Sequence, residues 1–100
     1  MTDPGSPAIR PFRQDGPYVD YRKLSPEVAA ILRRKRTDRG ATLAHTAWVI
    51  GIDPAYLSRL ERGLRAPRRR VAEELIRVLD LSDEQADRLR DEVAPEFERR

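Results

Sequence analysis

Residues 42–63 read TLAHTAWVIGIDPAYLSRLERG, and this stretch predicts two short helices joined by a tight turn. Thr42 and Asp53 are of the types that cap helix N-termini, and the proline that follows Asp53 suits a first helical position. Gly51 permits the left-handed backbone that the turn needs, and Gly63 ends the second helix. The stretch therefore indicates a compact helical pair rather than one long helix.

The second helix, over 54–62, has few residues that it can bury. Leu57 and Leu60 are its large apolar pair, and they share one face at helical spacing. The other face carries mainly polar side chains, which are those of Tyr56, Ser58, Arg59 and Arg62. A short helix with a narrow apolar stripe and a free polar face is suited to contact another molecule.

Three further helices are predicted around this pair, each with apolar residues at helical spacing. They run from the Ser25 cap to Gly40, from about Arg68 to Asp80, and from the Ser82 cap to Pro95. The residues of the chain outside 54–62 that we expect to face inward are Val28, Ile31, Leu32, Lys35, Leu43, Thr46, Ala47, Ile50, Val71, Leu75, Val78, Leu79, Ala86, Leu89 and Val93. No strand-like alternation is present, so the predicted fold class is all-α with five helices.

The domain organisation follows from where proline and glycine gather. Residues 1–24 contain four prolines and no helical period, and they predict an extended N-terminal tail that carries Phe12, Tyr18 and Tyr21. Residues 25–94 form the predicted folded domain, and residues 95–100 form a C-terminal tail. The apolar fraction of 39% supports one modest core.

The charges divide the chain into a basic middle and an acidic end. Residues 25–70 hold eleven cations and four anions, a net charge of +7, whereas residues 71–100 hold five cations and ten anions, a net charge of −5. Eighteen of the 20 cations are arginine, the side chain that grips phosphate at two points. This division indicates one face that suits a polyanion and another that faces elsewhere.

Several classes of protein do not fit the sequence. It has no cysteine and a single histidine, His45, so we expect no metal site and no cofactor. The neighbouring acidic pairs Glu73/Glu74 and Asp91/Glu92 diverge on a helix, so we do not expect an enzyme. No apolar run is long enough to cross a membrane, and the N-terminus has no apolar signal segment. We expect a cytoplasmic protein.

The segment RKRTDRGATLAHTAWVIGIDPAYLSRLERGLRAP resembles the helix-turn-helix family of Cro and lambda repressor, also called XRE. The resemblance covers about residues 27–81, and its most specific positions are Ala47, Gly51, Leu57, Glu61 and Gly63. It implies a five-helix lambda-repressor-like domain with the helix-turn-helix at 42–62. It also implies an internal ion pair between Arg36 and Glu61.

By the same resemblance, the helix over 54–62 reads bases in the DNA major groove. The implied base-reading positions are Pro54, Ala55 and Arg59, with Tyr56 and Ser58 nearby. Ala55 can touch a thymine methyl group, and Arg59 can bridge guanine O6 and N7. The alternatives for Arg59 are a phosphate contact or a solvated surface position.

The resemblance also implies phosphate contacts, which position the protein on DNA. The implied residues are Thr42, Leu43, Arg62, Arg65, Arg68 and Arg69. The family often has glutamine where this chain has Leu43, a departure that weakens one anchor. The alternative for the arginines is a solvated charge run.

The sequence thus predicts a DNA-binding transcriptional regulator, a repressor that binds double-stranded DNA as a homodimer. We expect the dimer contact through the last helix and/or the N-terminal tail. Trp48 and Val49 occupy positions that the family usually fills with polar residues, and either the tail or a dimer partner would cover them. The main alternative is an antitoxin-like module that binds a partner protein through its acidic C-terminal helices. RNA binding is a weaker alternative, because no aromatic stacking platform accompanies the basic residues.

Overall fold

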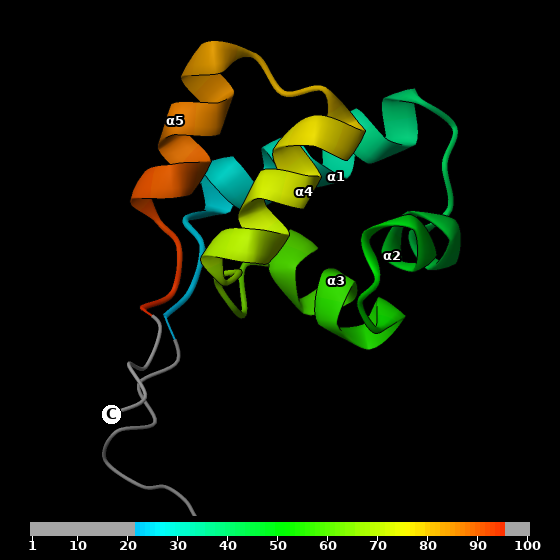
Figure 1. The fold of residues 1–100 in the computed structure, drawn as a ribbon, viewed down its shortest axis with the longest axis horizontal. Helices are drawn as coiled ribbons and strands as arrows, with labels where there is room; N and C mark the ends of the chain where they lie inside the picture. Colours follow the sequence, from blue (N-terminus) through cyan, green and yellow to red (C-terminus); the bar gives the residue numbers. More distant parts are fainter. Residues whose placement is uncertain (1–21, 96–100) are drawn as a thin grey trace, which may run out of the picture.

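The computed structural model describes residues 22–95, which form five α-helices and no strand (Figure 1). The helices are α1 (Pro26–Asp38), α2 (Leu43–Ile50), α3 (Pro54–Glu61), α4 (Arg69–Leu79) and α5 (Asp83–Asp91). The predicted all-α class with five helices is confirmed. The predicted tails lie almost wholly at residues 1–21 and 96–100, outside the described part.

Four of the five helices begin at a side-chain cap that the sequence predicted. The Ser25 hydroxyl accepts a hydrogen bond from the backbone N–H of Val28, and Thr42 and Asp53 cap α2 and α3 in the same way. Ser82 and Gln85 form a complete capping box at α5. These caps satisfy backbone donors that would otherwise be left without a partner at each helix start.

Two glycines make turns that other residues would strain. Gly51 has φ +86° and joins α2 to α3. Gly63 has φ +73° after α3, and a Cβ there would lie 3.4 Å from the carbonyl oxygen of Leu24. The left-handed backbone at these two points sets the directions in which the chain enters and leaves α3.

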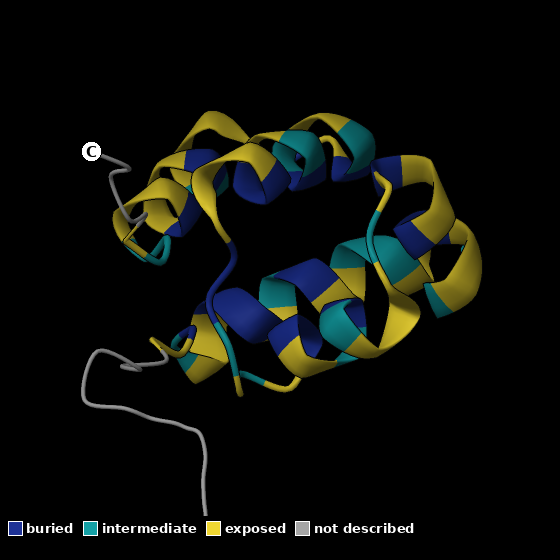
Figure 2. Cartoon of the chain, turned by 60° about the horizontal axis from the view of Figure 1, so that its bottom comes forward, coloured by how far each residue is buried: buried dark blue, intermediate teal, exposed yellow. Residues whose placement is uncertain are grey.

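The core lies between the helices, and the exposed residues cover their outer faces (Figure 2). Its largest fully buried side chains come from every helix except α2, and they are Val28, Leu32, Leu57, Leu60, Leu75, Leu79 and Leu89, with Pro67 from the loop. α2 adds Ala47, which has no exposed surface and is small enough for α2 to pack closely against α3 and α4. The core thus holds α3 by its leucine pair and leaves its opposite face open.

The inward faces differ in detail from the prediction. Ile31, Lys35, Leu43, Val78 and Val93 are half-buried rather than buried. Small or loop residues complete the core instead, and these are Leu24, Ala29, Ala66, Ala72 and Leu81. Alanine gives a weak periodic signal because its apolar surface is small, which is why the sequence pattern did not single these alanines out.

The folded part extends beyond the predicted start at residue 25. Leu24 is 3% exposed and belongs to the core, and the carbonyl oxygen of Arg22 accepts a hydrogen bond from Ala66 N at 2.7 Å. Residues 22–24 are therefore part of the domain rather than of a tail. Because the preceding segment is rich in proline and glycine, the sequence pattern placed this boundary too late in the chain.

The last helix ends earlier than predicted. α5 stops at Asp91, four residues before Pro95, because Glu92 turns away from the helical path. The Glu92 carboxylate accepts a hydrogen bond from Ser25 N at 2.7 Å, and Ala94 N donates to the Pro67 carbonyl oxygen at 2.8 Å. These contacts to distant parts of the chain hold residues 92–94 against α1 and the α3–α4 loop.

An exposed ion pair joins α4 to α5. Arg90 Nε and Nη2 donate to the two carboxylate oxygens of Glu73 at 2.8 and 3.0 Å. These hydrogen bonds hold the pKa of Glu73 below its ordinary value of 4.5. A lowered carboxylate pKa means that the pair stabilises the fold above about pH 4.5, and that this contribution is lost as the pH falls through the lowered pKa.

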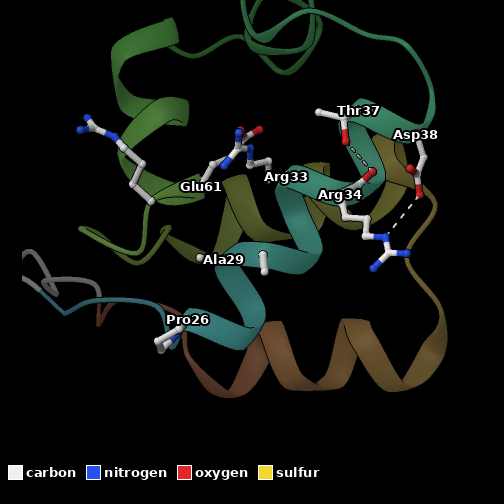
Figure 3. A pocket seen from close by; sticks show the side chains of 9 residues that line it. Pro26, Ala29, Arg33, Arg34, Thr37, Asp38 and Glu61 are labelled. Carbon is white, nitrogen blue, oxygen red and sulfur yellow. Dashed lines mark hydrogen bonds and ion pairs between the residues drawn. The ribbon is translucent and has the colours of Figure 1, made fainter.

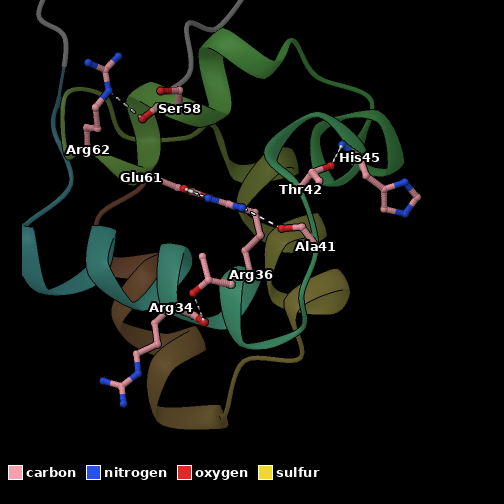
Figure 4. Close-up of polar contacts among 9 residues, drawn as sticks. Arg34, Arg36, Ala41, Thr42, His45, Ser58, Glu61 and Arg62 are labelled. Atoms are coloured by element: carbon pink, nitrogen blue, oxygen red, sulfur yellow. Dashed lines mark hydrogen bonds and ion pairs between the residues drawn. The ribbon is translucent and has the colours of Figure 1, made fainter.

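The Arg36–Glu61 pair connects three segments of the chain (Figure 4). Arg36 Nε donates to Glu61 Oε2 at 2.6 Å, Nη2 donates to Oε1 at 2.9 Å, and Nη1 donates to the Ala41 carbonyl oxygen at 2.8 Å. The side chains are only 13% and 5% exposed. The hydrogen bonds to Glu61 raise the pKa of Arg36, so its guanidinium stays charged. One guanidinium thus fixes α1, the end of α3 and the entry to α2 together.

We expect Glu61→Ala to lower the free energy of unfolding by roughly 3–5 kcal/mol, because it leaves the buried Arg36 charge without its partner. Glu74→Ala is the matched control, since Glu74 pairs with Arg77 of the same helix at the surface of the protein. Its effect should stay below about 1 kcal/mol. Urea denaturation of the two variants measures both values. A Glu61→Ala variant as stable as the parent would contradict the structural role of the pair.

Candidate nucleic-acid interface

The exposed face of α3 is formed by three of the predicted base-reading residues. Pro54, Ala55 and Arg59 are exposed, whereas Leu57 and Leu60 are completely buried beneath them. Ala55 and Arg59 are four residues apart and so lie one above the other on the same side of the helix. The structure therefore brings these three side chains onto one accessible surface.

The two remaining predicted base readers lie less openly. Tyr56 is half-buried and packs against the core. Ser58 is also half-buried, and its carbonyl oxygen accepts a hydrogen bond from Arg62 Nε at 3.4 Å. They border the exposed face rather than form its centre.

At the start of α2, the predicted phosphate contacts Thr42 and Leu43 have other contacts within the protein. The Thr42 hydroxyl accepts a hydrogen bond from His45 N at 3.0 Å and so caps the helix. Leu43 is half-buried and packs against the core. Thr42 is exposed, so its hydroxyl hydrogen can still be donated outward, whereas Leu43 offers only its backbone.

Four predicted phosphate-contacting arginines follow α3 closely in the chain. Arg62, Arg68 and Arg69 are exposed, and Arg65 is half-buried. Arg68 is the N-cap residue of α4 and makes no side-chain capping hydrogen bond. The structure thus places these arginines on the loop that follows α3 and at the start of α4.

A shallow groove lies between α1 and the end of α3, with a volume of about 430 Å³ (Figure 3). Pro26, Ala29 and Ala30 contribute apolar surface to it, and Arg33, Arg34 and Arg62 contribute positive charge. The sequence reasoning did not assign Arg33 and Arg34 to the site, although the run of four cations at 33–36 was a signal for them. Asp38 and Glu61 also line the groove, and Arg34 Nε lies 3.9 Å from Asp38 Oδ2, so the groove carries charges of both signs.

An exposed apolar pair lies on α2. Trp48 is 77% exposed, and its neighbour Val49 is 42% exposed. The ring of His45 lies 6.2 Å from the indole, with a tilt of 31° between the planes. Both side chains are open to solvent within residues 22–95, and the expected cover by the N-terminal tail or a dimer partner stays a prediction.

Three of the six acidic residues of α4 and α5 pair with arginines within the domain. Glu73 pairs with Arg90, Glu74 with Arg77, and Asp87 with Arg90. The exposed positions of α5 are all charged, and they are Asp83, Glu84, Asp87, Arg88, Arg90 and Asp91. This helix therefore presents a polar outer face, because its apolar residues Ala86 and Leu89 are turned into the core.

Residues 22–95 contain no group of histidines and carboxylates arranged to hold a metal ion. None of their helices is long and apolar enough to span a membrane.

Comparison with known proteins identifies the family. A helix-turn-helix domain family matches residues 27–89. No curated protein matches the sequence. The crystal structure of the restriction-modification controller protein C.AhdI from Aeromonas hydrophila is similar, with 27% identity and a TM-score of 0.55 over 60% of this chain and 91% of that one. The chain belongs to the helix-turn-helix domain family and is an XRE-like DNA-binding protein of the Cro and lambda-repressor type.

Proposed function

We propose that the protein is a sequence-specific transcriptional regulator and not an enzyme. It reads the major groove with α3 and grips phosphates with the arginines that follow it. One observation carries this proposal: α3 buries its leucine pair and exposes Pro54, Ala55 and Arg59 beside the arginine-rich loop. The similar protein C.AhdI is described as a controller protein, which supports a regulatory role.

Repression is the mode of action that needs the fewest further contacts. A protein that occupies an operator excludes other proteins from the same DNA, and for this it needs only affinity and sequence preference. We therefore propose a repressor that acts in the cytoplasm on the nucleoid. Selection of binding sites from random duplexes by the full chain, at a stated salt concentration, tests the proposal. If no preferred sequence emerges, the proposed function is wrong.

In such a selection, Arg59→Ala should relax the preference at one base pair. Loss of a bidentate arginine–guanine contact removes about 1–3 kcal/mol of discrimination at that position. The fold should be unaffected because the side chain is exposed. Thermal unfolding of the variant provides the control. A selected motif identical to that of the parent would show that Arg59 contacts phosphate or solvent instead.

For Arg65→Ala and Arg68→Ala we expect weaker binding to every sequence. Each phosphate contact that is lost should lower the slope of log K against log salt concentration by about one unit. Arg77→Ala is the control, because Arg77 is exposed near the C-terminal end of α4 and pairs with Glu74 of the same helix. Titrations at several salt concentrations give the slopes. An unchanged slope removes the arginine in question from the phosphate contacts.

We further propose that the protein binds its operator as a symmetric homodimer. One module of this size buries only about 600–1,000 Å² on DNA, which is little for a specific site in a genome. A two-fold partner doubles the sequence that is read and places the two α3 helices about 34 Å apart, one turn of DNA. The proposed contact lies on α5 and/or the N-terminal segment 1–24.

Sedimentation of the free protein and of its DNA complex tests the dimer, and we expect two copies on a palindromic site. Because the outer face of α5 is charged, a contact there should weaken at high salt and on Arg88→Glu. A dimer that resists both changes but is lost on Trp48→Ser would place the contact at the apolar pair on α2. One copy on a non-palindromic site would contradict the dimer.

A protein-binding role is the second candidate, and the exposed Trp48 and Val49 favour it. The acidic helices that first suggested an antitoxin-like module support it less, since three of their six carboxylates already pair with arginines of the domain. A binding partner would then be expected to cover α2 rather than α4 and α5.

A further inference from the structure

The short segment that precedes α1 is held against the domain at both of its ends. At one end, the Arg22 carbonyl oxygen accepts a hydrogen bond from Ala66 N at 2.7 Å. At the other end, Ser25 N donates to Glu92 Oε1 at 2.7 Å. Between these two contacts the Leu24 side chain is buried in the core. The segment is therefore a fixed part of the domain surface, although it lies outside the helices.

This segment carries two cations that the sequence reasoning did not assign to the site. Arg22 and Lys23 are both exposed, and neither forms an ion pair with another residue of the described part, 22–95. The contact between Arg22 and the α3–α4 loop uses its backbone carbonyl, which leaves the guanidinium group available. Arginine and lysine are usually exposed, so exposure alone gives these two residues no role.

Their place beside the α3–α4 loop is what distinguishes them. Ala66, which donates the hydrogen bond to Arg22, lies in that loop between Arg65 and Arg68, two of the proposed phosphate contacts. Extended backbones joined by such hydrogen bonds run about 5 Å apart. Arg22 is therefore a direct neighbour of the loop, and the cations of two segments that are far apart in the chain lie at one edge of the domain.

The DNA backbone is the ligand that suits cations arranged in this way. Duplex DNA carries one negative charge for about every 1.7 Å of its axis, so an array of cations at one edge meets several phosphate groups. Arginine binds phosphate at two points, whereas lysine acts as a compact point charge.

We propose that Arg22 and Lys23 bind phosphate groups of the DNA backbone next to the α3–α4 loop, so that the phosphate contacts of this protein come from two segments. The inference rests on the proposed function, since it requires the α3–α4 loop to face DNA. Contacts of this kind add affinity and fix the position of the protein, but they carry no sequence information. A dimer contact through the N-terminal segment would then involve the residues before Arg22.

Arg22→Ala and Lys23→Ala, made singly and together in the full chain, test the inference. Affinity for the selected operator is measured at several salt concentrations. Each single variant should reduce the slope of log K against log salt concentration by about 0.9 unit, and the double variant by about 1.8. The loss of affinity in the double variant should therefore be about twelvefold larger at 50 mM salt than at 200 mM. The selected sequence should not change.

Two further variants separate a phosphate contact from other effects. Arg22→Lys keeps the charge and should keep most of the slope. Arg77→Ala removes the same charge from α4, where Arg77 pairs with Glu74, and should leave the slope close to that of the parent. Thermal unfolding of Arg22→Ala should match the parent, because the hydrogen bond to Ala66 uses the backbone carbonyl and is retained.

The possible failures of the inference and of the proposed function can be told apart. If the parent selects a preferred sequence while the double variant keeps the parent's slope, the inference is wrong and the proposed function stands. An equal reduction in Arg77→Ala would show that net charge, rather than contact, sets the slope, and this too would overturn the inference. A parent that selects no sequence would contradict the proposed function and the inference together.

Discussion

The Arg36–Glu61 contact is the interaction on which the arrangement of the helix-turn-helix depends. A carboxylate on a helix that approaches DNA would repel phosphate if it faced outward. Here Glu61 points inward to a guanidinium that also binds the Ala41 carbonyl oxygen, directly before α2. The negative charge is thereby neutralised, and the same arginine sets the positions of α1, α2 and α3 relative to one another. One side chain therefore both offsets a negative charge near the proposed DNA-binding face and sets the geometry of the three helices.

Much of the fold could be predicted because its signals are local. Each helix cap could be predicted from a few adjacent residues, and so could the turn at Gly51. The caps are Ser25, Thr42, Asp53 and Ser82. The end of α5 could not be predicted, since Glu92 leaves the helix to contact a backbone amide 67 residues away. Such a contact depends on tertiary structure, and no pattern within a short window reports it.

The candidate site likewise has features that the sequence predicts and features that depend on the tertiary structure. The resemblance located the face of α3 and the arginine loop, and the structure adds which side chains are open to solvent there. Tyr56 illustrates the difference, because it is half-buried against the core although the sequence grouped it with the free polar face of its helix. The groove lined by Arg33 and Arg34 could not be predicted from the sequence, because it forms only when the fold brings α1 close to Arg62. Resemblance to a family indicates which positions belong to a site, whereas packing decides which of those residues are accessible.

The hydrogen bonds at the two ends of the described chain have a consequence for the arginine loop. Ala66 N donates to Arg22 and the Pro67 carbonyl accepts from Ala94, so adjacent residues of the loop are tied to segments on either side. Both Ala66 and Pro67 are buried, while Arg65 and Arg68 flank them. The loop is thus ordered before any polyanion arrives, and the conformational entropy of fixing its backbone is lost during folding instead of during association. Preorganisation of this kind lets a small domain keep more of its electrostatic attraction as binding free energy.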